Sequence, residues 1–205
     1  MAYGVGALAS AKAAVAFGVG SEASKESAVA LGSVATASGT KAIAVGYNAQ
    51  ATKDHATAMG AGGTDIATAT TASGIGATAF GGNATKGAQA LAADSIAMGG
   101  QSSVAAASTA GIAIGLAANA SVGTSTVALG NNATASNTRA IAIGGDASNV
   151  TKASGTDSIA IGSKTSASGT VHRHRYWQHG GWQQLVCDGQ QRLHRCSNQR
   201  LHRHW

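Results

Sequence analysis

A four-residue pattern, in which two large apolar residues flank Ala and a Gly follows, recurs along the chain and constrains its fold more than any other feature. Ile141-Ala142-Ile143-Gly144 is one copy. The closing glycines are Gly4, Gly18, Gly32, Gly46, Gly60, Gly81, Gly99, Gly115, Gly130, Gly144 and Gly162. Five of their ten intervals are 14 residues and the others are 15 to 21. A repeat this short predicts a stack of small, similar units.

Each unit reads as strand, turn, strand, turn. The large residues stand at i and i+2, which is the period of a β-strand, and the Gly predicts a turn where the backbone bends without a Cβ. A second alternation follows three and five residues after the Gly, as in Ala35 and Ala37, before a polar turn such as Ser38-Gly39-Thr40. Stacked units of this kind form a parallel β-solenoid, in which each rung adds about 4.8 Å. An Ala-rich helix is the alternative, and the glycines, the β-branched residues and the i, i+2 spacing argue against it.

The alternation also suggests how the faces are used. We expect the large residues to fill the narrow interior of the roll and the Ala face to be left for neighbouring chains. Burial of the large side chains of one chain alone does not offset the entropy lost on ordering the backbone, which favours an oligomer. Residues 61–81 hold the longest insertion, and 82–98, 100–114 and 145–161 hold shorter ones. We expect these insertions to form loops that protrude from one edge, where binding often occurs, although they could also be spacers.

Charge divides the chain at residue 169. The net charge is +6, but residues 170–205 carry six Arg and only Asp188, so residues 1–169 are nearly neutral. The C-terminal segment also holds all three Trp, both Cys and six of the seven His. At face value it would suggest binding of nucleic acid or metal. Cys187 and Cys196 lack the C-x-x-C spacing of a zinc site, so the metal signal is weak.

A shift of reading frame explains the C-terminal segment better. When the codons for His172 to Tyr176 are read one base later, they give Ile or Thr, a codon that can encode Ala, Ile or Thr, and a codon that can encode Gly, which matches the repeat itself. The same shift applied to Cys187 through Gln190 restores a second Gly 14 codons after the first. We therefore predict two regions: repeats in 1–169, and a frameshifted, non-native tail in 170–205 whose His, Cys, Arg and Trp carry no evolved function.

Catalytic and cofactor chemistry is not expected, and we predict neither an enzyme nor a metal or cofactor site. A solenoid enzyme would need clustered acids or a nucleophile with a base. The acids of the repeat region are instead spread along it and are read as solvated loop charges: Glu22, Glu26, Asp54, Asp65, Asp94, Asp146 and Asp157. His55 is expected at the surface. Gly60 to Gly63 lacks the Lys-Ser/Thr of a phosphate loop, and Gly62 to Asp65 is a lone fragment of a calcium-binding nonapeptide.

The repeated [Ile/Val]-Ala-[Ile/Leu/Val]-Gly-x-x-Ala-x-Ala unit of 14 residues resembles the YadA-like head domain of trimeric autotransporter adhesins over residues 1–169. The resemblance implies an all-β, left-handed parallel β-roll with rungs of about 14 residues, assembled as a homotrimer. It also implies virulence-related adhesion to host extracellular matrix or cells, self-aggregation in some members, and display beyond a stalk and an outer-membrane anchor. The chain has neither stalk heptads nor that anchor, nor a signal peptide or a membrane helix, so we expect a fragment with no direct membrane insertion. No nucleic-acid partner is expected.

A second function class stays open. The Thr-rich run from Thr68 to Thr71 suggests an ice- or surface-binding solenoid that acts as a single chain. A flat Thr array would need Thr at one fixed phase in every rung, whereas the runs here are scattered. The host ligand, and the residues that bind it, cannot be assigned from a motif, because adhesion by such repeats would use a broad surface.

Overall fold

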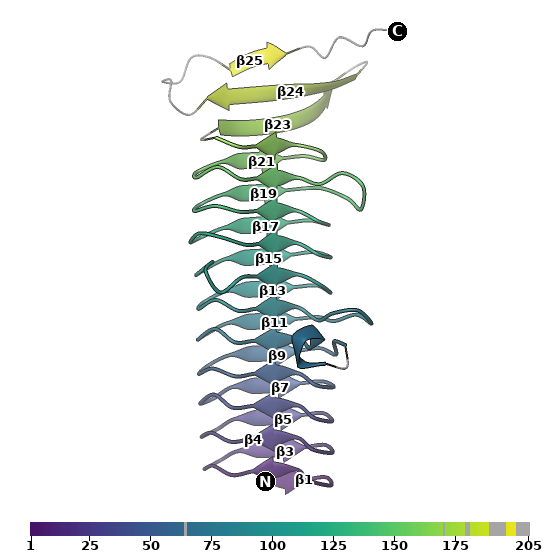
Figure 1. Ribbon diagram of the computed structural model, residues 1–205, viewed down its shortest axis with the longest axis vertical. Helices are drawn as coiled ribbons and strands as arrows, with labels where there is room; N and C mark the ends of the chain where they lie inside the picture. The colour runs from purple at the N-terminus through teal and green to yellow at the C-terminus, as the bar shows by residue number, and fades with distance from the viewer. Residues whose placement is uncertain (64, 170, 179–180, 189–195, 200–205) are drawn as a thin grey trace.

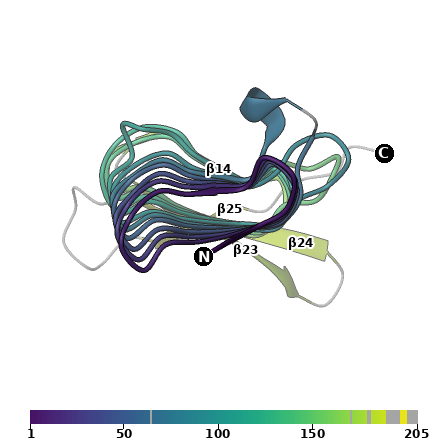
Figure 2. The same cartoon turned by 90° about the horizontal axis from the view of Figure 1, so that it is seen from below.

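The computed structural model describes residues 1–63, 65–169, 171–178, 181–188 and 196–199. The chain alternates between two sheets of parallel strands and rises by one rung with each unit, so that the rungs form a tall stack (Figure 1). Seen along the stack, the rungs are flattened loops that superimpose closely (Figure 2). The predicted all-β parallel solenoid is confirmed.

The first sheet, sheet A, contains the large apolar–Ala–large apolar segments, which form the strands expected from their alternation. Eleven of its fourteen strands are parallel rungs, and the last three come from the tail. The strands are β1 (Ala2–Tyr3), β3 (Val15–Phe17), β5 (Val29–Leu31), β7 (Ile43–Val45), β9 (Thr57–Met59), β11 (Thr78–Phe80), β13 (Ile96–Met98), β15 (Ile112–Ile114), β17 (Val127–Leu129), β19 (Ile141–Ile143), β21 (Ile159–Ile161), β23 (Val171–Gln178), β24 (Gly181–Asp188) and β25 (Cys196–Gln199).

The second sheet, sheet B, contains the weaker alternation that follows each glycine. Its eleven strands have two residues each. They are β2 (Leu8–Ala9), β4 (Glu22–Ala23), β6 (Thr36–Ala37), β8 (Gln50–Ala51), β10 (Thr71–Ala72), β12 (Gln89–Ala90), β14 (Ser103–Val104), β16 (Asn119–Ala120), β18 (Thr134–Ala135), β20 (Lys152–Ala153) and β22 (Ser166–Ala167).

Equivalent residues of successive rungs stack directly on one another. Phe17 pairs with Leu31, and the Ala at the centre of each strand pairs with the next central Ala. The register survives the longest interval, since Met59 still pairs with Phe80 across an insertion. Insertions are therefore absorbed in the turns, and the period of the sheets is kept.

The insertions occupy two edges of the stack, which corrects the expectation of a single edge. Three of them follow sheet A strands and lie on one edge: residues 61–70, which include the short 3-10 helix η1 (Ile66–Thr68), 82–88 and 145–151. The fourth, residues 105–111, follows strand β14 of sheet B and therefore lies on the other edge. Both edges tolerate extra residues because each turn only has to return the chain to the register of the next strand.

Pairing changes character beyond residue 170. Strand β23 still pairs in parallel with β21, whereas β24 and β25 add in antiparallel fashion. Residues 172–174 are in register with Ile159, Ala160 and Ile161. The predicted roles of the tail's Cys, His, Arg and Trp side chains lie outside the described part of the molecule, and the division of the chain after residue 169 stays a prediction.

Candidate functional site

The interior of the stack is lined by alanines. The central residue of the sheet A strands has at most 1% of its surface exposed in every rung from the second to the eleventh: Ala16, Ala30, Ala44, Ala58, Ala79, Ala97, Ala113, Ala128, Ala142 and Ala160. Sheet B also points small residues inward, as at Ala35 and Ala37. The largest fully buried side chain is Val104. Among the described residues, the core is thus built almost wholly from Ala, Ser and Thr.

The expectation that large residues fill the roll was therefore wrong. Strand alternation puts the central residue of each sheet A strand on one face and its two neighbours on the other, and the central Ala is the one that faces inward. Each inward side chain has an equivalent about 4.8 Å above and below it, and a second sheet faces it. A large side chain at this position would have to be accommodated in every rung at once, and overpacking of a core is destabilising.

The large apolar residues instead form the outer face of sheet A. We call the first residues of its strands the leading column: Val15, Val29, Ile43, Thr57, Thr78, Ile96, Ile112, Val127, Ile141 and Ile159. We call the third residues the trailing column: Tyr3, Phe17, Leu31, Val45, Met59, Phe80, Met98, Ile114, Leu129, Ile143 and Ile161. Neither column contains a charged residue. Phe17 is 50% exposed and Phe80 48%, so large apolar side chains of this face stand exposed along the stack, which is typical of an interaction site.

The glycines of the repeat follow this face and form a column of their own along the edge that we call the glycine edge. All eleven have φ between +102° and +141°. At Gly46, a Cβ would lie 2.5 Å from the carbonyl oxygen of Gly60 in the next rung. Both the φ and the close stacking of backbones exclude a side chain at such a position.

At some core positions Ser or Thr stands where other rungs have Ala, and its hydroxyl donates a hydrogen bond to a carbonyl oxygen of a turn. The Ser95 hydroxyl donates to the Ala92 carbonyl oxygen at 2.7 Å, and the Thr151 hydroxyl donates to that of Gly162 at 2.7 Å. Ser158 stands one residue before its strand, as Ser95 does, but its buried hydroxyl has no hydrogen-bond partner among the described residues. These hydroxyls serve the backbone, and they are not arranged as nucleophiles with a base.

The outer face of sheet B is polar. Its central rungs carry Thr36, Gln50, Thr71, Gln89, Ser103, Asn119 and Thr134. Gln89 is buried and donates to the carbonyl oxygen of Ala69 in the longest insertion. The two outer faces therefore differ sharply, with apolar residues on sheet A and uncharged polar residues over most of sheet B.

The threonine run that suggested an ice-binding array does not form one. Thr68 lies in η1, Thr70 is buried and donates to the Gly81 carbonyl oxygen at 3.1 Å, and Thr71 belongs to strand β10. The three threonines therefore lie in different parts of the rung and do not share one flat surface.

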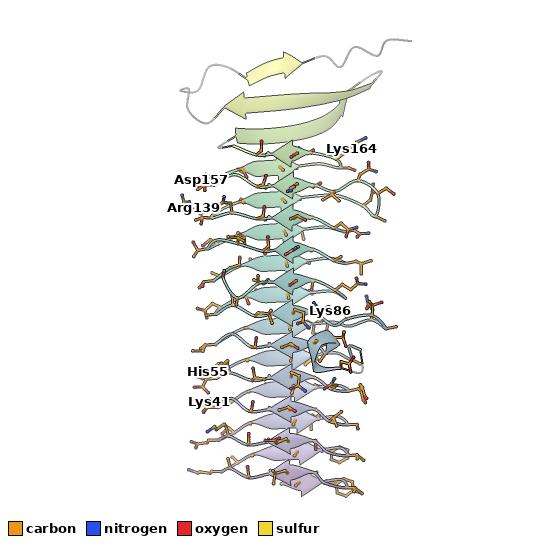
Figure 3. The ribbon with its side chains drawn as sticks, viewed as in Figure 1. Lys41, His55, Lys86, Arg139, Asp157 and Lys164 are labelled. Atoms are coloured by element: carbon orange, nitrogen blue, oxygen red, sulfur yellow. The ribbon has the colours of Figure 1, made fainter. Side chains whose placement is uncertain are left out.

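The charged residues lie mostly in the turns. Figure 3 shows Lys41, His55, Arg139 and Asp157 along the edge opposite the glycines, which we call the charged edge. Two ion pairs join rungs there: Arg139 with Asp157 (2.8 Å between Nη2 and Oδ2), and Lys12 with Glu26 (4.0 Å). His55 is exposed on this edge.

Three carboxyl groups of the turns accept hydrogen bonds, two of them from a neighbouring rung. The backbone N–H of Thr40 donates to Asp54 at 2.8 Å and lowers the pKa of that carboxyl. The pKa of Asp146 is lowered mainly by the backbone N–H of Ser148, and that of Asp157 by the Arg139 guanidinium. Each interaction stabilises a turn.

The predicted acids are not brought together. Asp54 and Asp157 are many rungs apart on the charged edge, Asp146 lies in a loop of the glycine edge, and Asp65 is exposed in the longest insertion. The described residues contain no group of three or more His, Cys, Asp or Glu that could hold a metal ion. In the same part of the chain, no helix is long and apolar enough to cross a membrane.

The geometry defines a class of protein: a parallel β-solenoid with an alanine core, whose most distinctive surface is a flat apolar sheet face. A comparison with known protein families identifies this class. The chain belongs to the YadA head domain family, because the YadA head domain repeat (2 copies) matches residues 2–35, 37–62, 121–147 and 153–170, about half of the chain. No curated protein matches the chain. The resemblance read from the sequence is thereby confirmed, and the longest unmatched stretch, 63–120, includes the irregular intervals after Gly60, Gly81 and Gly99.

Proposed function

We propose that the chain is the head, or passenger, segment of a trimeric autotransporter adhesin, and that it acts on the bacterial surface as a homotrimer of left-handed β-rolls. One observation carries the proposal: the outer face of sheet A is uncharged through eleven rungs and, except for Thr57 and Thr78, apolar. Isolated in water, such a face costs free energy and invites aggregation. Burial against two further copies removes it from water.

The adhesive surface then follows from what the trimer leaves exposed. With sheet A turned inward, the polar face of sheet B and the loops of both edges face outward. We propose that this broad surface attaches to host extracellular matrix or cells, supports aggregation between bacteria, and is displayed from the outer membrane by the full-length protein. It needs no cofactor and no catalytic group.

The test begins with the molar mass of the full chain, measured by light scattering after gel filtration. We expect three times the 19.9 kDa chain mass, with β-type circular dichroism. Ile143→Lys, on the apolar face, is expected to yield folded monomers, because each copy would bury an unpaired charge. Thr134→Lys, in the preceding rung on sheet B, is the matched control and should stay trimeric.

Binding is tested next with immobilised matrix proteins and the trimeric wild type. Saturable binding to a matrix protein supports adhesion. A folded wild-type monomer would refute the trimer and revive the single-chain surface-binding solenoid.

We also propose that residues 170–205 are an out-of-frame continuation of the repeat. The register of the sheet supports this reading. Residues 172–174 align with Ile159, Ala160 and Ile161, and the shifted frame gives Ile or Thr, a codon that can encode Ala, and Ile or Thr at those same positions. The nucleotide sequence of the gene decides the matter, since an uninterrupted frame with no extra or missing base near codon 170 would refute it.

A further inference from the structure

Four asparagines of the chain begin the sequence Asn-x-Ser/Thr, which is the acceptor sequence for N-linked sugars. They are Asn83, Asn119, Asn132 and Asn149, and each lies on the glycine edge or at the start of the sheet B strand that follows it. Such sequences also arise by chance in a chain rich in Ser and Thr, so the fold has to separate an acceptor from a coincidence. An acceptor must present both its side-chain Nδ2 and the hydroxyl two residues later to a transferase.

Asn149 meets neither requirement in the folded chain. Its Nδ2 donates to both carboxylate oxygens of Asp146, at 3.1 Å each. The hydroxyl of Thr151 is buried and donates to the carbonyl oxygen of Gly162 at 2.7 Å. A transferase would have to open this loop and part of the core to reach the sequence.

Asn119 and Asn132 are held by sheet B. Asn119 begins β16, which pairs with a strand on each side, and its N–H donates to the carbonyl oxygen of Ala133 at 2.8 Å. Thr134, the hydroxyl residue that follows Asn132, lies in β18 and is also paired on both sides. Neither segment can enter an active site without breaking the hydrogen bonds of the sheet.

Asn83 lies instead in a loop that stands away from both sheets. Residues 82–88 protrude from the glycine edge (Figure 1). The loop is closed at its base, where the N–H of Ala88 donates to the carbonyl oxygen of Gly81 at 2.9 Å. The two residues after Asn83 are exposed. An exposed loop on a rigid base is the part of a fold that another enzyme can reach without unfolding it.

The loop also orients the Asn83 carboxamide. Its Oδ1 accepts from the N–H of Thr85 at 2.9 Å and from the N–H of Lys86 at 2.8 Å, which forms an Asx turn. The turn brings Thr85 close to the carboxamide and leaves Nδ2 out of both bonds. A Cβ on Gly100 in the next rung would lie 2.5 Å from Nδ2, so the missing side chain leaves room beside this nitrogen.

We propose that Asn83 is the acceptor for an N-linked sugar in the folded protein. The co-substrate is a hexose joined through C1 to a pyrophosphate, and the catalyst is a transferase of the cell that makes the chain. Nδ2 attacks C1, the bond from C1 to the phosphate oxygen breaks, the pyrophosphate leaves with that electron pair, and a base of the transferase takes the proton from Nδ2. The inference goes beyond the proposed function and applies equally to a monomer and to a trimer.

The test treats the folded full chain with two transferases that act on Asn-x-Ser/Thr. One is a soluble enzyme supplied with uridine diphosphate glucose, and the other is an oligosaccharyltransferase supplied with a lipid pyrophosphate oligosaccharide. Peptide mapping by mass spectrometry locates the sugar, and its mass shows which donor the site accepts. We expect roughly tenfold or more sugar at Asn83 than at Asn149, because only Asn149 requires local unfolding.

The same chain unfolded by heat is the control, and there both asparagines should be modified to a similar extent. Sugar at both sites in the folded chain to an equal extent would overturn the inference. So would a folded chain in which Asn83 stays unmodified with both donors while the unfolded chain is modified. Light scattering reports the oligomeric state separately, so a failure of the proposed trimer leaves this result unaffected.

Substitution of the hydroxyl residue provides a second measurement. Thr85→Ala should abolish the modification of Asn83, and Thr85→Ser should retain it, because the transferase reads the hydroxyl two residues after the asparagine. Thr134→Ala, which changes the equivalent residue after Asn132, is the matched control and should leave Asn83 modified. Circular dichroism checks that each variant is folded. A folded Thr85→Ala variant that still carries sugar on Asn83 would contradict the assignment.

Discussion

Two glycines of one turn, Gly18 and Gly20, allow a sharp test of how the rungs stack. Gly18 has φ +134°, which is outside the left-handed region that other residues enter, and a Cβ on it would lie 2.6 Å from the carbonyl carbon of Gly32 and closer still to its oxygen. Gly20 has φ +64°, and a Cβ there meets only the end of the Val34 side chain, at 3.3 Å. Val34 itself has φ +50° at the equivalent position one rung above, so this position accepts a side chain.

The two alanine substitutions should therefore differ strongly. Gly18→Ala adds backbone strain of about 1–3 kcal/mol and a clash with backbone that the next rung must move to relieve, so we expect a total loss of about 3 kcal/mol or more. A chain of this size loses roughly 2–4 °C in melting temperature per kcal/mol, which makes the expected drop about 6–12 °C. Gly20→Ala costs about 1 kcal/mol at most, because the strain of a left-handed residue is partly offset by the reduced entropy of the unfolded chain.

Thermal unfolding followed by circular dichroism measures both variants under the same conditions. Equal melting temperatures for Gly18→Ala and Gly20→Ala would refute the reasoning, because the two changes are chemically identical and differ only in φ and in the backbone they meet.

Three further predictions follow from the core and the turns. Ala44→Leu should lower the free energy of unfolding by about 1–3 kcal/mol in denaturant titrations, because the Ala column has no room for it; an unchanged midpoint would contradict this packing. Ser95→Ala should cost about 1 kcal/mol, whereas Ser158→Ala should be neutral or stabilising, since only Ser95 loses a hydrogen bond; a larger loss at Ser158 would be inconsistent with its unpaired hydroxyl. The hydrogen bond from the Thr40 N–H lowers the pKa of Asp54 in the folded protein below the ordinary Asp value of about 3.9. This hydrogen bond therefore stabilises the fold above that ordinary value, and the stabilisation is lost as the pH falls through the pKa that Asp54 has in the folded protein. Melting curves of Asp54→Asn across that range should lack this part of the acid dependence, and an unchanged pH profile would argue against it.

The repeat made most of the fold predictable. The i, i+2 spacing located the strands of sheet A, the glycines located the turns that follow them, and the interval of 14 residues indicated stacked parallel rungs. These features are local, since each depends on the backbone preferences of a few neighbouring residues. The family could be recognised for the same reason.

The candidate site depended on the tertiary structure. Alternation shows that Ala142 and its neighbours Ile141 and Ile143 face opposite sides, but it does not say which side is the interior. That choice is made by the second sheet and by the rungs above and below, which leave space for little more than Ala, Ser and Thr. The apolar face and the distribution of loops over two edges both follow from contacts between residues about 14 or more positions apart, and no local pattern reports such contacts.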